Sequence, residues 1–152
     1  MSIEDEVAVL SQTPVLAELD EQALRVVAFS ADKRDLRTGE TLVLRGERSD
    51  GGYFVVSGSF SLHRQPEPEP EADVVRAGGL IGEMALITPT EHPVTAIARE
   101  PSSVLKIPRN VFQRVLREYP GSAARVRAMI EHRLVGYTGD LQTLRQKLMG
   151  DQ

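Results

Sequence analysis

The chain has 152 residues, 26% of them charged, and a formal net charge of −4. This length favours one domain with one core, and because Lys and Arg form no dense cluster we expect no direct nucleic-acid binding. The sequence contains no cysteine and no apolar run near the roughly eighteen residues of a membrane span, so we expect a cytoplasmic protein without disulfides, thiolate metal sites or membrane segments.

Residues 1–32 are predicted to be helical. Apolar side chains recur along them, and Thr13-Pro14 interrupts the pattern, so we expect two short helices. Asp20 precedes the second helix, Glu21–Phe29. Its side-chain oxygen is expected to accept a hydrogen bond from a free N–H of the first turn.

Residues 33–107 are predicted to form strands. Eight of the twelve glycines lie between Gly39 and Gly82, and the short β-rich runs between them are typical of a small barrel or sandwich. Residues 65–72 alternate Pro and Glu, so we expect a surface loop there. The runs expected to be strands are Thr41–Leu44, Tyr53–Ser57, Ser59–His63, Asp73–Arg76, Thr95–Ala98 and Val104–Ile107.

Residues 108–149 are predicted to be helical again. Pro108 suits a first helical turn, Tyr119-Pro120-Gly121 ends that helix, and a longer helix begins near Ser122. The apolar residues of the longer helix recur in steps of three and four, close to a heptad pattern. They are Val126, Ile130, Leu134, Tyr137, Leu141, Leu144 and Leu148.

The apolar seam of this last helix has two candidate partners, the chain's own strands or a second copy of the chain. We favour a homodimer, because the seam runs far beyond the predicted strands. Gly136 and Gly139 interrupt the pattern, so the helix either kinks there or stops and restarts with Asp140 as a cap. The positions expected at the dimer interface are Leu134, Leu141 and Leu144.

The most specific chemistry lies in the stretch Leu80–Ala98. Gly82 permits a sharp backbone turn. Glu83 opens a short apolar helix, Met84–Ile87, whose first N–H groups are unpaired and suit a phosphate. Glu83 can also accept hydrogen bonds from sugar hydroxyls, and phosphate with ribose indicates a nucleotide. The side chains expected to exclude water from this site are Leu80, Ile81, Met84, Ala85 and Leu86.

This stretch resembles the phosphate-binding cassette of the cyclic nucleotide-binding domain family, which typically reads F-G-E-L-A-L, a few loop residues, and then P-R-A-A-T. Ile81–Leu86 reads IGEMAL, and Thr95 and Ala98 match the end of the pattern. Similar matches to the family's other motifs occur at Val15–Leu19 with Leu24, at Gly39–Leu42 with Gly46–Arg48, and at Tyr53–Gly58.

The resemblance implies an α+β fold, in which an antiparallel β-roll of jelly-roll-like form is flanked by N-terminal and C-terminal helices. It implies a single domain over residues 1–152, with helices at 1–32, the roll at 33–107, the cassette at 80–95 and helices at 108–149. It also implies cAMP or cGMP as the ligand, with no further cofactor. The ligand-binding positions that it carries over are Gly82, Glu83, Met84, Ala85, His92, Pro93, Val94 and Thr95.

Three positions depart from the family pattern. His92 stands where the family has the arginine that pairs with the cyclic phosphate, and Pro93 has no N–H to offer at the next position. Glu91 places a negative charge beside the expected anion. The lost charge-assisted hydrogen bond and the missing N–H together weaken binding on the order of 10²- to 10³-fold.

Two functions of different classes follow from this pattern. In the first, a stand-alone module without a helix-turn-helix senses a cyclic nucleotide or a related anionic ligand and signals through its C-terminal helices to an unknown effector protein. In the second, the pocket is degenerate and the chain is a ligand-free dimerisation or adaptor module. The sequence shows no nucleophilic triad, Walker-type loop or histidine cluster, so we expect neither an enzyme nor a metal site.

Overall fold

The structure is a computed structural model that describes residues 2–64 and 72–132. Two predictions lie outside these residues: the loop at 65–71, and the apolar seam from Leu134 onward with its interface positions Leu134, Leu141 and Leu144. Within the described residues, no helix combines the length and the hydropathy that crossing a membrane requires.

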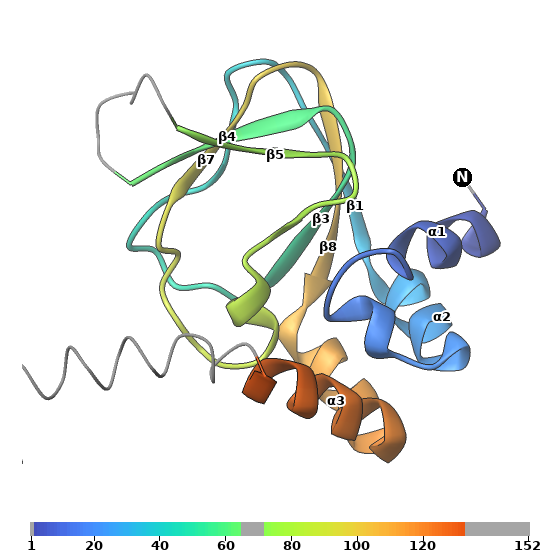
Figure 1. The fold of residues 1–152 in the computed structure, drawn as a ribbon. Coiled ribbons are helices and arrows are strands. Elements are labelled where there is room, and N and C mark those ends of the chain that lie inside the picture. The colour runs from blue at the N-terminus through green and yellow to red at the C-terminus, as the bar shows by residue number, and fades with distance from the viewer. Residues whose placement is uncertain (1, 65–71, 133–152) are drawn as a thin grey trace, which may run out of the picture.

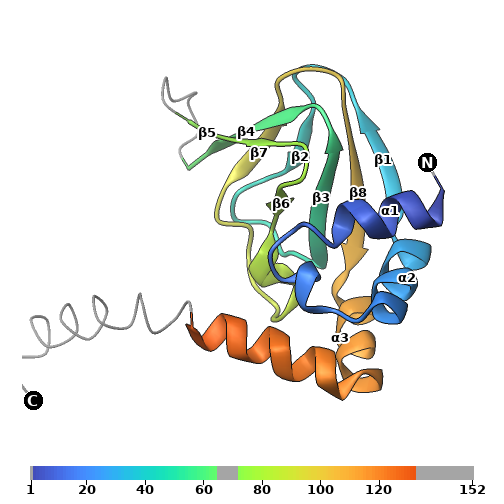
Figure 2. The same ribbon diagram turned by 45° about the vertical axis from the view of Figure 1, so that its right-hand side comes forward.

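The described residues contain two four-stranded antiparallel sheets, which face each other (Figures 1 and 2). The first sheet has the order β1-β8-β3-β6 and the second the order β2-β7-β4-β5. The predicted β-roll is confirmed, as two open sheets that do not close into a barrel. The strands are β1 Asp32–Leu36, β2 Thr41–Val43, β3 Gly51–Ser57, β4 Ser59–His63, β5 Asp73–Arg76, β6 Leu80–Ile81, β7 Thr95–Ala98 and β8 Ser102–Pro108.

Helices gather against the outer face of the first sheet (Figure 2). They are α1 Ile3–Leu10, the 3₁₀ turn η1 Leu16–Glu18, α2 Glu21–Ser30 and α3 Arg109–Glu118. A second 3₁₀ turn, η2 Glu83–Leu86, lies in the cassette. Residues 120–132 are also helical, which agrees with the helix expected near Ser122. The break at Thr13-Pro14 is confirmed.

The alternation of side chains along the central strands builds two cores. Phe54, Leu105 and Ile107 face the helices and are buried in one cluster with α1, α2 and α3. Val55 and Val104 face the opposite sheet and are buried in the second cluster. The first sheet therefore contributes buried apolar side chains to both of its faces, and the end of the cassette packs against its helical face.

Three sequence predictions need correction. Asp20 is the N-cap residue of α2, but its side chain makes no capping hydrogen bond, and it pairs with Arg125 in the last helix instead. Pro108 ends β8 in an extended conformation and is the N-cap of α3 rather than part of its first turn. The strands β1 and β6 were not predicted. Four of the five β1 residues are exposed, and a polar edge strand lacks the apolar alternation that reveals a strand.

Candidate functional site

The cassette begins where β6 turns into η2. Gly82 has φ 80° and ψ 40°, a left-handed conformation that costs glycine little and other residues more. The Ala85 N–H donates to the Gly82 carbonyl oxygen at 3.0 Å and closes the turn. The predicted glycine turn before a short helix is therefore present, with the helix reduced to one 3₁₀ turn.

The apolar side chains of the turn point in different directions. Ala85 and Leu86 are 2% and 0% exposed, whereas Met84 is 52% exposed, so the expectation that Met84 helps to exclude water is wrong. Leu86 belongs to the helical core, and it lies so close to Gly52 that a Cβ on this glycine would be 3.0 Å from Leu86 Cγ. Leu86 thus packs the end of η2 against β3 and the helical core.

Residues 85–92, the end of η2 and the loop that follows it, are called the cassette loop. Its C-terminal end, at Thr90 and His92, is hydrogen-bonded to the turn before β3. The Gly46 N–H donates to the His92 carbonyl oxygen at 2.9 Å, and the His92 N–H donates to the Glu47 carbonyl oxygen at 2.8 Å. Ser49 donates twice to the Thr90 carbonyl oxygen, from its N–H at 2.9 Å and from its hydroxyl at 2.7 Å. This short antiparallel ladder fixes the loop and engages the N–H of His92.

The side chain of His92 is buried, with 7% of the residue exposed. Desolvation lowers the pKa of His92 below its ordinary value of 6.5, and this effect outweighs the nearby carboxylates of Asp50 and Glu47, which raise the pKa. The ring is therefore mostly neutral at pH 7. At this position it does not supply the fixed positive charge that an arginine would.

The remaining predicted positions lie beside the ladder. Pro93 is exposed and Val94 is half-buried. The Thr95 hydroxyl accepts a hydrogen bond from the Arg45 backbone N–H at 3.0 Å. Glu91 is exposed and forms an isolated antiparallel bridge with Arg48. The second half of the cassette therefore pairs with the segment that precedes β3.

A cluster of charges that the sequence did not reveal lies on the inner face of the first sheet. Alternation along β8 places Lys106 on the same face as Val104, and its Nζ lies 2.9 Å from Asp50 Oδ2. This hydrogen bond lowers the pKa of Asp50. Lys106 and Arg34 also lie over the Tyr53 ring, 6.0 and 5.8 Å from its centroid. A charged residue at an inward position of an alternating strand is the pattern that would have revealed Lys106.

Arg109 was also missed, although it is the first residue of α3 and lies against the cassette. Its guanidinium donates to the carbonyl oxygens of Ser49, Ala85 and Thr88. A sequence pattern does not reveal such contacts, because they join segments that are 21 to 60 residues apart.

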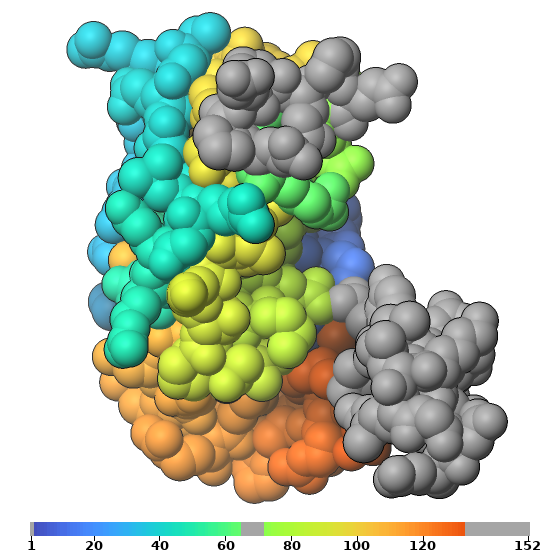
Figure 3. Space-filling view, turned by 90° about the vertical axis from the view of Figure 1, so that its left-hand side faces the viewer, coloured from blue at the N-terminus to red at the C-terminus, as the bar shows by residue number. Residues whose placement is uncertain are grey.

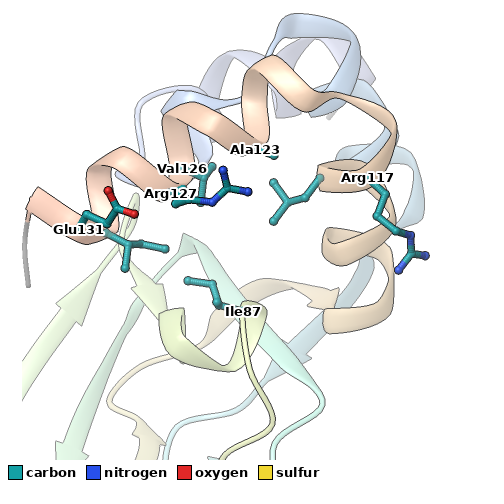
Figure 4. A pocket seen from close by; sticks show the side chains of 8 residues that line it. Ile87, Arg117, Ala123, Val126, Arg127 and Glu131 are labelled. Atoms are coloured by element: carbon teal, nitrogen blue, oxygen red, sulfur yellow. The ribbon is translucent and has the colours of Figure 1, made fainter.

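A groove of about 400 Å³ lies on the helical side of the cassette, between α3 and the helical residues 120–132 (Figure 4). Ile87, the residue after η2, lines it together with Leu116 and Val126. The end of the cassette and the C-terminal helices therefore share one apolar surface.

Comparison with known proteins identifies this arrangement. The sequence model of the cyclic nucleotide-binding domain matches residues 33–119. The chain belongs to the cyclic nucleotide-binding domain family. The match covers the whole roll and α3, including both halves of the cassette.

Solved structures of similar proteins share the fold. A cyclic nucleotide-binding-like protein from Brucella abortus is 32% identical, with a TM-score of 0.67 over 74% of this chain and 98% of that one. The N-terminal domain of a transcriptional regulator from Streptomyces coelicolor is 27% identical, with a TM-score of 0.78 over 88% of this chain and 94% of that one.

A curated relative is much longer. The neuropathy target esterase sws of Drosophila grimshawi is 29% identical over 115 residues, which are 74% of this chain and 8% of that protein. The similarity therefore concerns a small part of the esterase.

Proposed function

We propose that this cyclic nucleotide-binding domain is a regulatory module that senses cAMP, cGMP or a related anionic ligand in its cassette. The ligand would lie against Gly82–Ala85 and His92–Thr95. Ligand occupancy would shift the C-terminal helices and so report to an effector protein. Such a response requires that the ligand bind the two states of the module with different affinity.

The burial of Leu86 carries this proposal. Leu86 is fully buried in the cluster that also contains Phe112 and Val115 of α3 and Val126 of the last helix. The side chain lies three residues after Glu83, within the same 3₁₀ turn. A ligand that moves this turn therefore changes the packing of the C-terminal helices, because a close-packed core transmits small displacements.

The proposed chemistry is binding and not catalysis. Glu83 would accept hydrogen bonds from ribose hydroxyls, and the turn at Gly82 would admit the phosphate. The neutral ring of His92 and the missing N–H of Pro93 predict an affinity lower than a cassette with arginine would have. We place this module in the cytoplasm as a homodimer through Leu134, Leu141 and Leu144, with neither nucleic acid nor membrane as its direct partner.

A second function is favoured by one observation. The His92 N–H is already bonded to Glu47, and Pro93 has none, so two successive backbone positions of the cassette offer no donor to a phosphate. A cassette that binds no ligand would leave the chain a constitutive dimerisation or adaptor module.

Calorimetric titration with cAMP and with cGMP, at pH 6.0 and pH 7.5, separates the two functions. The sensor predicts binding heat that is weakened by Glu83→Ala and unchanged by Glu21→Ala, a matched substitution of an exposed acid in α2. The absence of heat at millimolar nucleotide at both pH values would contradict the sensor for these ligands and favour the adaptor.

A further inference from the structure

Arg109 joins three segments that are distant in the sequence. Its backbone N–H donates to the Asp50 carbonyl oxygen at 2.7 Å. Its Nη2 lies 2.8 Å from the Ser49 carbonyl oxygen, and its Nη1 lies 3.2 Å from that of Ala85 and 3.3 Å from that of Thr88. The start of α3 is therefore tied to the segment before β3 and to the end of η2.

These contacts hold the cassette loop at both ends. Ala85 and Thr88 belong to the beginning of the loop. Ser49, the third partner, donates to the Thr90 carbonyl oxygen from both its N–H and its hydroxyl, and Thr90 lies at the end of the loop. The Arg109 side chain thus contacts the beginning of the cassette loop directly and is linked to the end of the loop through Ser49.

The surface view shows the same arrangement. The cassette, coloured yellow-green and yellow, lies beside the teal segment that precedes β3, and the orange residues that include α3 lie below both (Figure 3). A surface pocket of about 310 Å³ is lined by Arg109, Arg48, Ser49, Thr90 and two neighbours of Thr90. Arg109 is half-buried at the junction of the three segments.

The guanidinium group suits this role because of its shape. It presents several N–H donors in a plane, so it can reach carbonyl oxygens on different sides at once, whereas a lysine ammonium is a compact charge on a flexible stem. Among the described residues no carboxylate forms a salt bridge with Arg109. Its closest partners are backbone carbonyls, and a longer hydrogen bond of 3.4 Å reaches the Ser49 hydroxyl, so its position follows the backbone of the loop.

We propose that Arg109 is a positioning residue that couples the cassette to α3, so that a displacement of the loop at 85–90 is passed to the C-terminal helices. This inference rests on the proposed sensing function for its ligand-dependent part. It adds a polar link to the apolar contact that Leu86 makes, and this link also includes the segment before β3.

Hydrogen exchange of the full chain tests the coupling, with Arg109→Lys as the variant and Arg114→Lys as the matched control. Arg114 lies on the same helix, and its guanidinium pairs with the exposed Glu118. We expect Arg109→Lys to accelerate exchange of the Ser49 and His92 N–H groups about tenfold or more, while Arg114→Lys leaves them unchanged. The amides of β4 report whether the fold is intact.

A second measurement separates coupling from a purely structural role. In the unsubstituted chain, saturating cAMP is expected to change exchange in residues 120–130. In Arg109→Lys, cAMP is expected to bind while this remote change is lost. Should Arg109→Lys loosen the whole fold, Ser49→Ala replaces it, because this substitution removes the hydroxyl that donates to Thr90 and accepts from Arg109 while the backbone contacts of Ser49 remain.

The outcomes distinguish this inference from the proposed function. If cAMP changes the hydrogen exchange of residues 120–130 equally in Arg109→Lys and in the unsubstituted chain, the coupling through Arg109 is overturned while the sensing function stands. If the unsubstituted chain binds neither nucleotide, sensing fails and the ligand-dependent coupling fails with it. The exchange rates at Ser49 and His92 then decide the ligand-independent part, that Arg109 positions the loop: acceleration supports it and unchanged rates overturn it.

Discussion

A buried imidazole and a guanidinium at position 92 differ mainly in their charge at neutral pH. The ring of His92 is shielded from water, and desolvation lowers its pKa. Binding of a phosphate beside the ring would favour the protonated form and raise that pKa. Protonation and ligand binding are therefore coupled, and affinity for an anion rises as the pH falls toward the pKa of the free protein.

This coupling predicts a pH dependence that one substitution removes. Cyclic AMP should bind the unsubstituted chain more tightly at pH 6.0 than at pH 7.5. His92→Arg should tighten binding at pH 7.5 about 10- to 100-fold, since a charge-assisted hydrogen bond contributes about 1.5–3 kcal/mol, and should flatten the pH profile. Calorimetry at both pH values measures this, and equal affinities of the two proteins would show that the ligand lies elsewhere.

Individual residues were predicted unevenly. The turn at Gly82 followed from the freedom of glycine, and the sequence placed it correctly. Asp20 occupies the predicted cap position, but the Arg125 guanidinium pairs with its carboxylate and the Ser122 hydroxyl accepts from its N–H. A local capping rule cannot foresee a partner 105 residues away.

At the scale of elements, η2 is the link between the cassette and the helical core. One of its four residues, Leu86, is fully buried, while Met84 in the same turn is mostly exposed. The sequence IGEMAL predicted a short apolar turn but not which of its side chains face the core, because a turn this short has no amphipathic period to read.

Leu86→Ala and Met84→Ala form a matched pair within this turn. Leu86→Ala should lower the free energy of unfolding by about 2–5 kcal/mol, the usual cost of truncating a buried leucine. Met84→Ala should change it by less than about 0.5 kcal/mol, as surface substitutions usually do. Urea denaturation measures both values. Equal effects would contradict the conclusion that Leu86, and not Met84, packs the cassette into the helical core.

The strands show where sequence patterns succeed and fail. The predicted bounds of β3, β4 and β8 differ from the observed bounds by no more than two residues at any end. The charged edge strand β1 was missed because its pairing with β8, and not its own composition, makes it a strand. The two residues of β6 are too few to show alternation.

In the whole molecule, contacts between the roll and the helices link the cassette to the C-terminal helices. Leu86 and Arg109 connect the cassette to α3, and Arg125 connects the last helix to α2 through Asp20. The resemblance of the motifs predicted the roll and its flanking helices, but the polar links between them come from tertiary structure. Dimerisation through Leu134, Leu141 and Leu144 stays a prediction.

If ligand occupancy moves the C-terminal helices, the distance between a spin label on the roll and one on the last helix changes when cAMP binds. The chain has no cysteine, so cysteines introduced at the exposed positions Lys33 and Ala128 carry the only labels. Labels at Lys33 and Ser57, both within the roll, provide the control. Saturating cAMP is predicted to shift the Lys33–Ala128 distance distribution and to leave the control unchanged. An unchanged Lys33–Ala128 distribution at saturation would show that ligand occupancy does not move the last helix.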